Sequence, residues 1–332
     1  MELFTLAFMQ RALLAALFTG LAAPAVGTYL VQRRLALMGD GIGHVAVTGV
    51  ALGLLTGTSP TWTAVVVATL GAVLIEVIRE RGHANGDVAL ALLFYGGLAG
   101  GVLLTGLAGQ SATRLQQYLF GSITTISATD VWITIALAAV VVLVCVGLSP
   151  QLFAVAQDQE FARVAGLNVR AYNLLVAVQA AVSVTDAMRT VGLLLVSALM
   201  VVPVATAQQV TRSFRTTLVA AMALGTVASV GGLVVSAFAS YRWRVSPGPS
   251  IVLLALAGFT VTWPLGVFLR SRQRLRAPFP AIDAEEHEVA CDEHPHEHGP
   301  DCGHVAVRHG DHVDYVHDGH RHAPHGRHYD EH

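Results

Sequence analysis

The sequence predicts an all-α, polytopic integral membrane protein, a bundle of eight or nine transmembrane helices followed by a disordered, histidine-rich C-terminal tail. Hydrophobic residues make up 54% of the 332 positions. Charged residues make up only 13%, against about 25% in an ordinary soluble domain. Apolar stretches also recur at the length of about 20 residues that a helix needs to cross a bilayer.

The apolar stretches predict the spans one by one. A span at 43–57 would be short for a bilayer, so that stretch either crosses, for nine spans, or re-enters, for eight. We expect a transmembrane domain over 1–276 and a tail over 277–332. The stretches, in chain order, lie at 7–31, 43–57, 62–78, 88–108, 131–149, 171–188, 190–210, 217–240 and 250–269.

Charge separates the membrane domain from the tail. Residues 1–282 hold 17 arginines and 9 acidic residues, a net charge of +8. Residues 283–332 hold 3 arginines and 13 acidic residues, a net charge of −10, and 13 of the 15 histidines. With nine spans and the N-terminus outside, cytoplasmic segments hold 12 arginines and outer segments hold 5. This bias agrees with the positive-inside rule and predicts a cytoplasmic tail.

The chain contains no lysine, which limits the possible functions. A P-loop needs its lysine to reach the β- and γ-phosphates of a nucleotide, so any ATP hydrolysis belongs to another chain. The H-E-x-x-H pattern of metalloproteases is absent too. These two absences argue against a P-loop ATPase and against an intramembrane metalloprotease of that type. We also expect a protein that is not an enzyme, holds no intrinsic cofactor, contacts membrane lipid and has no nucleic-acid partner.

Asp40 and His44 are the first candidate site. They stand four residues apart where an apolar stretch begins, so on a helix they share one face. An ionisable residue inside a span is costly and normally faces the interior of the bundle. One interpretation is that Asp40 caps a helix starting near Gly41 and His44 packs beside it. The other is a metal site on a pathway, where two copies of the chain supply four N and O ligands suited to Zn²⁺ and acceptable to Mn²⁺.

A charged loop between two spans predicts a short amphipathic helix over residues 157–164. The arginine pattern places this loop on the cytoplasmic side, and a glycine follows it as a helix stop. It is either a solvated connector or a helix that docks into a groove on a partner. The residues that would serve such coupling are Asp158, Glu160, Phe161, Arg163 and Gly166.

Two further patterns lie inside the spans. Pro203 leaves the carbonyl of Leu199 without its helical partner and predicts a kink. With Thr206 and other small residues after it, this segment is either a tolerated membrane proline or a bent helix that lines a pathway. The stretch YGGLAGGVLL (residues 95–104) contains two overlapping G-x-x-x-G patterns, which predict close helix packing within one bundle or at a dimer seam.

Four blocks in order resemble the membrane permeases of zinc/manganese-type ABC importers, the ZnuB-like proteins. The resemblance covers about residues 8–270, and its departures are mild: Gly43 stands where the family usually has serine, while Asp40, His44 and Pro203 are in place. The blocks are RRLALMGDGIGHVAVTGVALG (33–53), YLFGSI (118–123), DQEFARVAGLNV (158–169) and VGLLLVSALMVVPVATA (191–207).

This resemblance implies a permease subunit that imports a divalent transition metal, zinc first and manganese second, across a bacterial cytoplasmic membrane. It implies a homodimer, two cytoplasmic ABC ATPase subunits and an extracytoplasmic metal-binding protein. Asp40 and His44 match the pair that the family associates with the metal. The segment DQEFARVAG (158–166) matches the coupling helix that transmits ATP-driven motion.

The tail is not part of the family pattern. Its composition predicts disorder. Imidazoles and thiols suit Zn²⁺ better than Mn²⁺, and their irregular spacing predicts several weak, interchangeable sites without a closed cage. The candidate metal ligands of the tail are His287, Cys291, His294, His296, His298, Cys302, His304, His309, His312, His317, His320, His322, His325, His328 and His332.

Three other functions fit the sequence less well than the importer does. A secondary zinc transporter of the cation-diffusion type needs paired His/Asp motifs on two helices within about six spans, and this chain has one such pair. A siderophore- or cobalamin-type ABC permease would have a similar coupling helix, but the Asp-x-x-x-His pair argues against a large organic cargo. A membrane metal sensor or scaffold would lack an ATPase partner.

Overall fold

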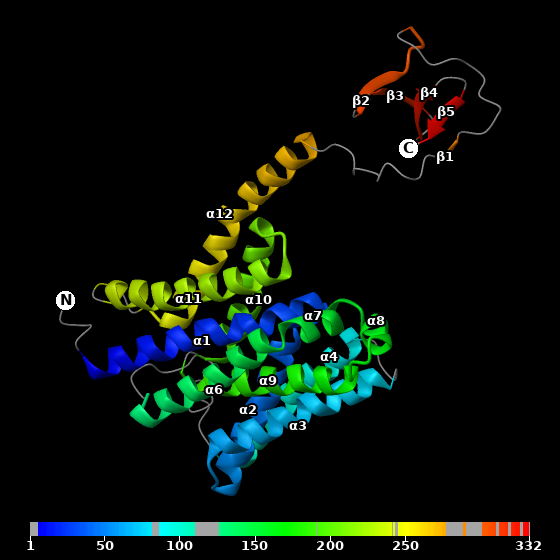
Figure 1. Ribbon diagram of the computed structural model, residues 1–332. Coiled ribbons are helices and arrows are strands. Elements are labelled where there is room, and N and C mark those ends of the chain that lie inside the picture. Colours follow the sequence, from blue (N-terminus) through cyan, green and yellow to red (C-terminus); the bar gives the residue numbers. More distant parts are fainter. Residues whose placement is uncertain are drawn as a thin grey trace. The chain divides into compact units, whose positions relative to one another are not determined.

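The computed structural model describes residues 6–81, 86–109, 126–190, 192–240, 242, 245–276, 288–289, 301–309, 312–317, 320–325 and 328–331. Its helices confirm the predicted polytopic bundle (Figure 1). In chain order they are α1 (Ala7–Gln32), α2 (Met38–Thr56), α3 (Pro60–Glu80), α4 (Gly86–Leu107), α6 (Ala128–Gly147), α7 (Ser149–Gln157), α8 (Gln159–Val164), α9 (Val169–Thr190), α10 (Leu193–Val210), α11 (Phe214–Ala239) and α12 (Pro247–Arg276).

Eight helices in the described part of the chain are long and apolar enough to cross a membrane, and α10 is a shorter apolar helix. The stretch at 43–57 belongs to α2, which has 19 residues and is among the eight. It gains this length at its start, where Met38–Ile42 contains two glycines and an aspartate that a search for apolar residues leaves out. The apolar helix that is shorter than the eight candidate spans is therefore α10, and not the stretch at 43–57.

Helix α1 lies in the middle of the bundle. It packs against α6, α9, α10 and α11, and Figure 1 shows it between α11 and the pair α6 and α9. Small residues let it approach its neighbours: a Cβ on Gly20 would lie 2.9 Å from the carbonyl oxygen of Gly225 in α11. A Cβ on Gly27 would overlap the backbone of Met200 in α10. Lipid supplies no hydrophobic force between helices, so such close backbone packing holds the bundle together.

The outer helices expose large apolar side chains on the surface of the chain. Trp62 and Leu70 of α3, Trp132 of α6 and Val261 of α12 are each more than 60% exposed. Apolar side chains can face outward without cost when hydrocarbon surrounds them, as composition predicts for a membrane domain.

The tail contains regular structure where the sequence predicted none. Its described residues form a five-stranded antiparallel sheet in the order β1-β5-β4-β3-β2. Alternating valine, tyrosine and histidine in segments such as HVDYVH (312–317) suit a pleated strand, which the composition of the whole tail did not reveal. The strands are β1 (Glu288–Val289), β2 (Val305–His309), β3 (His312–His317), β4 (His320–His325) and β5 (His328–Glu331).

The chain divides into two compact units, Met1–Leu269 and Arg270–His332. The sequence placed the boundary after residue 276, where α12 ends. The first unit contains nearly all the helical structure and the second contains the sheet.

Candidate functional site

Asp40 lies within the first turn of α2 and does not cap it. The helix begins at Met38, Leu37 holds the N-cap position, and no described side chain makes a capping hydrogen bond there. The interpretation of Asp40 as a cap is therefore wrong, because the helix starts at Met38 and not near Gly41. In the first turn the carboxylate instead faces the positive end of the helix dipole.

The Asp40 side chain opens into a pocket of about 230 Å³ between α2 and α4. Apart from this carboxylate, the lining is mostly apolar and aromatic. Asp40 is the one charged residue among those that line this pocket, which makes it the candidate ligand for a cation there. The lining residues are Leu37, Asp40, Leu90, Ala91, Phe94 and Tyr95.

His44 lies one helical turn beyond Asp40, beside the same part of α4. Its ring meets the ring of Phe94 edge-on, with the centroids 4.2 Å apart. Its Nδ1 atom is buried and has no hydrogen-bond partner among the described residues. A buried polar nitrogen without a partner is costly, which makes His44 a candidate ligand.

Glycines bring the neighbouring helices close to these two residues. A Cβ on Gly97 of α4 would lie 2.6–3.0 Å from the backbone of His44 and Val45. A Cβ on Gly43 would overlap the Leu193 side chain of α10. Of the two overlapping G-x-x-x-G pairs, Gly97 and Gly101 thus pack α4 on α2 within one chain. No described atom lies within 4 Å of a Cβ placed on Gly96, the first glycine of the other pair.

One chain does not supply a complete set of metal ligands at Asp40 and His44. Within the described residues there is no group of three or more His, Cys, Asp or Glu side chains that could hold a metal ion. Asp40 and His44 together offer one carboxylate and one imidazole. A transition metal in a protein usually has at least three such ligands.

Pro203 and Thr206 lie on α10, which runs through the proline without a break. Both are buried, and the Thr206 hydroxyl donates a hydrogen bond of 2.7 Å to the carbonyl of Val202. Helix α10 packs against α1, α2, α9 and α11. It therefore flanks the Asp40 helix, although a role in lining a pathway stays a prediction.

The charged loop between α6 and α9 contains the short helix that the sequence predicts, and α7 precedes it. Asp158 ends α7 and caps α8, since its Oδ1 accepts hydrogen bonds from the backbone N–H groups of Glu160 and Phe161 at 2.9 and 3.0 Å. The predicted start at Gln157 is therefore two residues early. A charged N-cap of this kind fixes the helix start locally.

Gly166 ends α8, as predicted. Its φ of +83° is left-handed, its N–H donates to the carbonyl of Arg163, and the N–H of Leu167 donates to that of Ala162. This pair of hydrogen bonds is the Schellman motif, in which glycine is favoured because it has no Cβ. Ala162 is fully buried against Val155, so α8 is anchored on one side.

The other side of α8 is exposed. Phe161 is 66% exposed and Val164 is 88% exposed. Glu160 and Arg163 form an exposed ion pair of 2.9 Å next to them. Apolar and charged groups thus stand together on a rigid, anchored helix, which is the surface needed to dock a partner.

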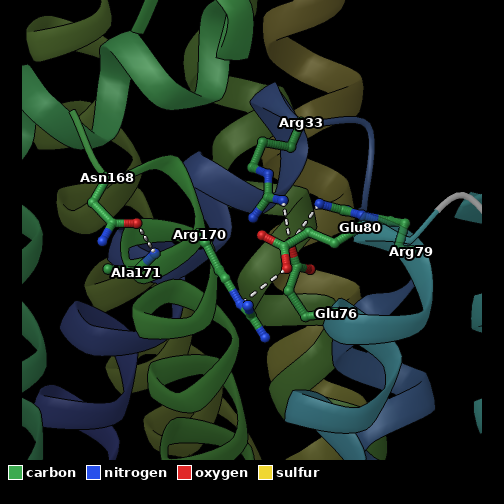
Figure 2. A network of polar contacts seen from close by, with 7 residues as sticks. All are labelled: Arg33, Glu76, Arg79, Glu80, Asn168, Arg170 and Ala171. Atoms are coloured by element: carbon green, nitrogen blue, oxygen red, sulfur yellow. Dashed lines mark hydrogen bonds and ion pairs between the residues drawn. The ribbon is translucent and has the colours of Figure 1, made fainter. Parts of the chain in front are cut away.

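A buried charge network centred on Glu76 was not predicted from the sequence. This side chain lies on α3 and is 1% exposed. Arg33 and Arg79 donate to its Oε1 at 2.9 and 2.8 Å, and Figure 2 shows both guanidinium groups turned toward it. The available signal was an acidic residue inside the predicted span at 62–78, since ionisable groups in spans need partners.

The network continues to the helix that follows α8. Arg170, in the first turn of α9, lies 3.2 Å from Glu80 at the end of α3 (Figure 2). Beside these residues is a polar pocket of about 750 Å³ at the ends of α1 and α3 and along α7, α8 and α9. Its charged lining residues are Arg33, Arg34, Arg79, Glu80, Glu160 and Arg163.

Residues 5–264 match the model of the ABC 3 transport family. The chain belongs to the ABC 3 transport family. This permease is a multi-pass transport subunit of an ABC metal importer and not an enzyme. Family membership implies ATPase and substrate-binding partners.

Similar proteins support the same assignment for the permease. It is 35% identical over 267 residues to the manganese import system permease protein ScaB of Streptococcus gordonii, covering 80% of this chain and 93% of that protein. It is 35% identical over 255 residues to a probable metal transport system membrane protein of Treponema pallidum, covering 75% and 92%. A chain of PsaBC from Streptococcus pneumoniae, solved in complex with Fab, matches with a TM-score of 0.71 at 32% identity, covering 81% and 97%.

Several predicted features lie outside the described residues. They are the YLFGSI block (118–123) and the tail ligands His287, Cys291, His294, His296, His298 and His332. Cys302 and His304 precede β2, and Cys302 is a free, half-buried thiol.

Proposed function

We propose that this permease imports zinc, with manganese as the competing cargo, and that Asp40 and His44 bind the ion during its passage. The observation that carries this is the buried Nδ1 of His44, which lacks a partner among the described residues one turn from a carboxylate in a pocket. The ion replaces the missing partner. The site must bind it well enough to remove water and weakly enough to release it.

A homodimer would complete the ligand set. One chain offers a carboxylate and an imidazole, so two chains related by symmetry offer two of each. Four N and O ligands suit tetrahedral Zn²⁺ and are acceptable to Mn²⁺. Similar permeases that are named for manganese import favour manganese, whereas the histidine-rich tail favours zinc. Direct competition between the two metals is therefore the informative measurement.

Helix α8 would be the coupling helix of this permease. Its exposed Phe161 and Val164 and the Glu160–Arg163 pair would dock on an ABC ATPase subunit in the cytoplasm of a bacterial cell. The arginine-lined pocket beside it offers a positive surface to that partner. An extracytoplasmic binding protein would deliver the ion from the other side, and the tail would lie in the cytoplasm.

The test measures uptake of radioactive zinc and manganese by cells that carry the permease with its ATPase. His44→Ala and Asp40→Asn should each reduce uptake to background, while the ATPase still co-purifies with the permease. Thr56→Val, at the far end of the same helix, should keep normal uptake. Normal uptake by both site variants would refute the metal site, and uptake without the ATPase would indicate a secondary transporter.

A further inference from the structure

The pocket beside Asp40 has a second polar side chain, which the proposed metal site does not use. Among the residues that line this space of about 230 Å³, Asp40 and Tyr95 alone have polar side chains. Tyr95 belongs to α4 and is 68% exposed. A cation that enters the pocket therefore meets a carboxylate from α2 and a phenol hydroxyl from α4.

Ring contacts fix the place of Tyr95 relative to the candidate ligand His44. The ring of Tyr95 meets the ring of Phe94 edge-on, with the centroids 5.5 Å apart. The ring of Phe94 in turn meets the ring of His44 edge-on. Two positions further along α4, Gly97 brings the backbone of α4 against the backbone of His44 and Val45. The close contact between the two helices thus holds Tyr95 beside the metal site.

The depth of Tyr95 in its span argues against a side chain that only faces lipid. The apolar span of α4 runs from Val88 to Leu107, which places Tyr95 about 10 Å along it at a rise of 1.5 Å per residue. Tyrosine is common in the interfacial belts at span ends, where its hydroxyl reaches headgroups and water. Hydrocarbon offers the hydroxyl no such partner, whereas a phenol shielded from water usually makes a hydrogen bond.

A hydroxyl in this pocket suits an ion that keeps part of its water. The pocket volume is several times the volume of about 30 Å³ that one water molecule occupies in the liquid. Mn²⁺ prefers an octahedral shell of oxygen ligands that includes water, whereas Zn²⁺ prefers four N, O or S ligands in a tetrahedron. A hydrogen bond from the protein to a water on the ion therefore stabilises hydrated Mn²⁺ more than it stabilises Zn²⁺.

We propose that Tyr95 is a specificity-determining residue of the permease. Its hydroxyl hydrogen-bonds to a water molecule on the ion beside Asp40 and raises the share of manganese among the imported metal. The imidazole of His44 acts in the opposite direction, because imidazole suits zinc. This inference rests on the proposed metal site at Asp40 and His44.

Uptake of radioactive zinc and manganese, each alone and in competition, tests the role of the hydroxyl. Tyr95→Phe removes one oxygen and keeps the ring that contacts Phe94. Loss of a group that hydrogen-bonds around a metal typically costs about 10–100-fold in affinity or activity. We expect the KM for manganese to rise by at least about tenfold, with zinc uptake close to normal, so that the ratio of zinc to manganese uptake increases.

Tyr172→Phe is the matched control. It removes the same hydroxyl from α9, and Tyr172 does not line this pocket. This variant should keep the wild-type ratio of the two metals. Normal membrane levels of both variants, with the ATPase still co-purifying, confirm that each permease has folded.

The outcomes separate this inference from the proposed metal site. An equal fall of zinc and manganese uptake in Tyr95→Phe would indicate a structural role, and unchanged uptake would indicate a lipid-facing side chain. Either result would overturn the role of Tyr95, while loss of uptake in Asp40→Asn and His44→Ala would still support the metal site. Normal uptake in those two variants would overturn both.

Discussion

The guanidinium of Arg33 lies 2.9 Å from Oε1 of Glu76, and the two side chains are 4% and 1% exposed. Arg33 follows the last turn of α1 and precedes the short connection to the Asp40 helix, while Glu76 belongs to α3. The ion pair therefore holds the segment that leads into the candidate metal site. Through Glu80 and Arg170, α3 is also tied to α9, the helix that follows α8.

Removal of Arg33 should destabilise the permease strongly. Arg33→Ala leaves the buried Glu76 paired with Arg79 alone among the described residues, and loss of one member of a buried pair costs about 3–5 kcal/mol. The double variant Arg33→Met with Glu76→Leu removes both charges and should recover most of the loss. Thermal unfolding in detergent measures this. The exposed Glu160–Arg163 pair supplies the control, because Glu160→Ala should hardly change the unfolding temperature.

Gly97 should be intolerant of any side chain. A Cβ there would lie 2.6 Å from the backbone N of Val45 and 2.7 Å from the backbone carbon of His44, atoms that cannot move aside by a rotamer change. Gly97→Ala should push α4 away from the metal site and lower metal uptake severely. Gly96→Ala, at the neighbouring position with no described atom within 4 Å, should be normal. Equal uptake by the two variants would show that the α2–α4 contact is not needed for transport.

A Cβ placed on Gly43 would contact a side chain, whereas one placed on Gly97 would contact backbone atoms. The Cβ on Gly43 would clash with the end of the flexible Leu193 side chain, so trimming that side chain can relieve the clash. Gly43→Ala should destabilise the permease by about 1–3 kcal/mol, the usual cost of overpacking. The double variant Gly43→Ala with Leu193→Ala should be more stable than the sum of the two single changes predicts. A double-mutant cycle on thermal unfolding measures this coupling, and strict additivity would contradict the contact.

Gly166 should matter for coupling through its backbone alone. Its φ is +83°, so a residue with a side chain would strain the backbone there. No described atom lies within 4 Å of a Cβ placed at this position, so the side chain itself would not clash. Gly166→Val should misplace α8 and separate ATP hydrolysis from metal uptake. Gly166→Asn should be milder, because asparagine tolerates the left-handed region. Assays of ATPase stimulation and uptake in proteoliposomes test this, and wild-type behaviour of the valine variant would make the loop a simple connector.

Deletion of residues 287–332 should leave transport intact. The family match ends at residue 264, so the tail lies beyond it. We expect the shortened permease to support metal-dependent growth at low zinc while losing most of its zinc-binding capacity, because the histidine cluster is removed. Growth and equilibrium dialysis measure the two effects. Complete loss of uptake at normal membrane levels would show that the tail takes part in transport.

Features that depend on neighbours along the chain were readable from the amino acids. The helical bundle follows from apolar length, because backbone groups in hydrocarbon must pair within their own segment. The stop of α8 at Gly166 follows from one residue type, and the Asp158 cap that the sequence did not name is local in the same way. The Asp-x-x-x-His spacing likewise predicts that Asp40 and His44 lie on one face of a helix.

Features that depend on distant parts of the chain required the folded structure. Asp40 lies inside its helix because α2 starts at Met38, and its pocket needs Leu90, Phe94 and Tyr95 from α4. Glu76 finds Arg33 across 43 residues. In each case the energy comes from contacts between segments far apart in sequence, which residue spacing does not encode.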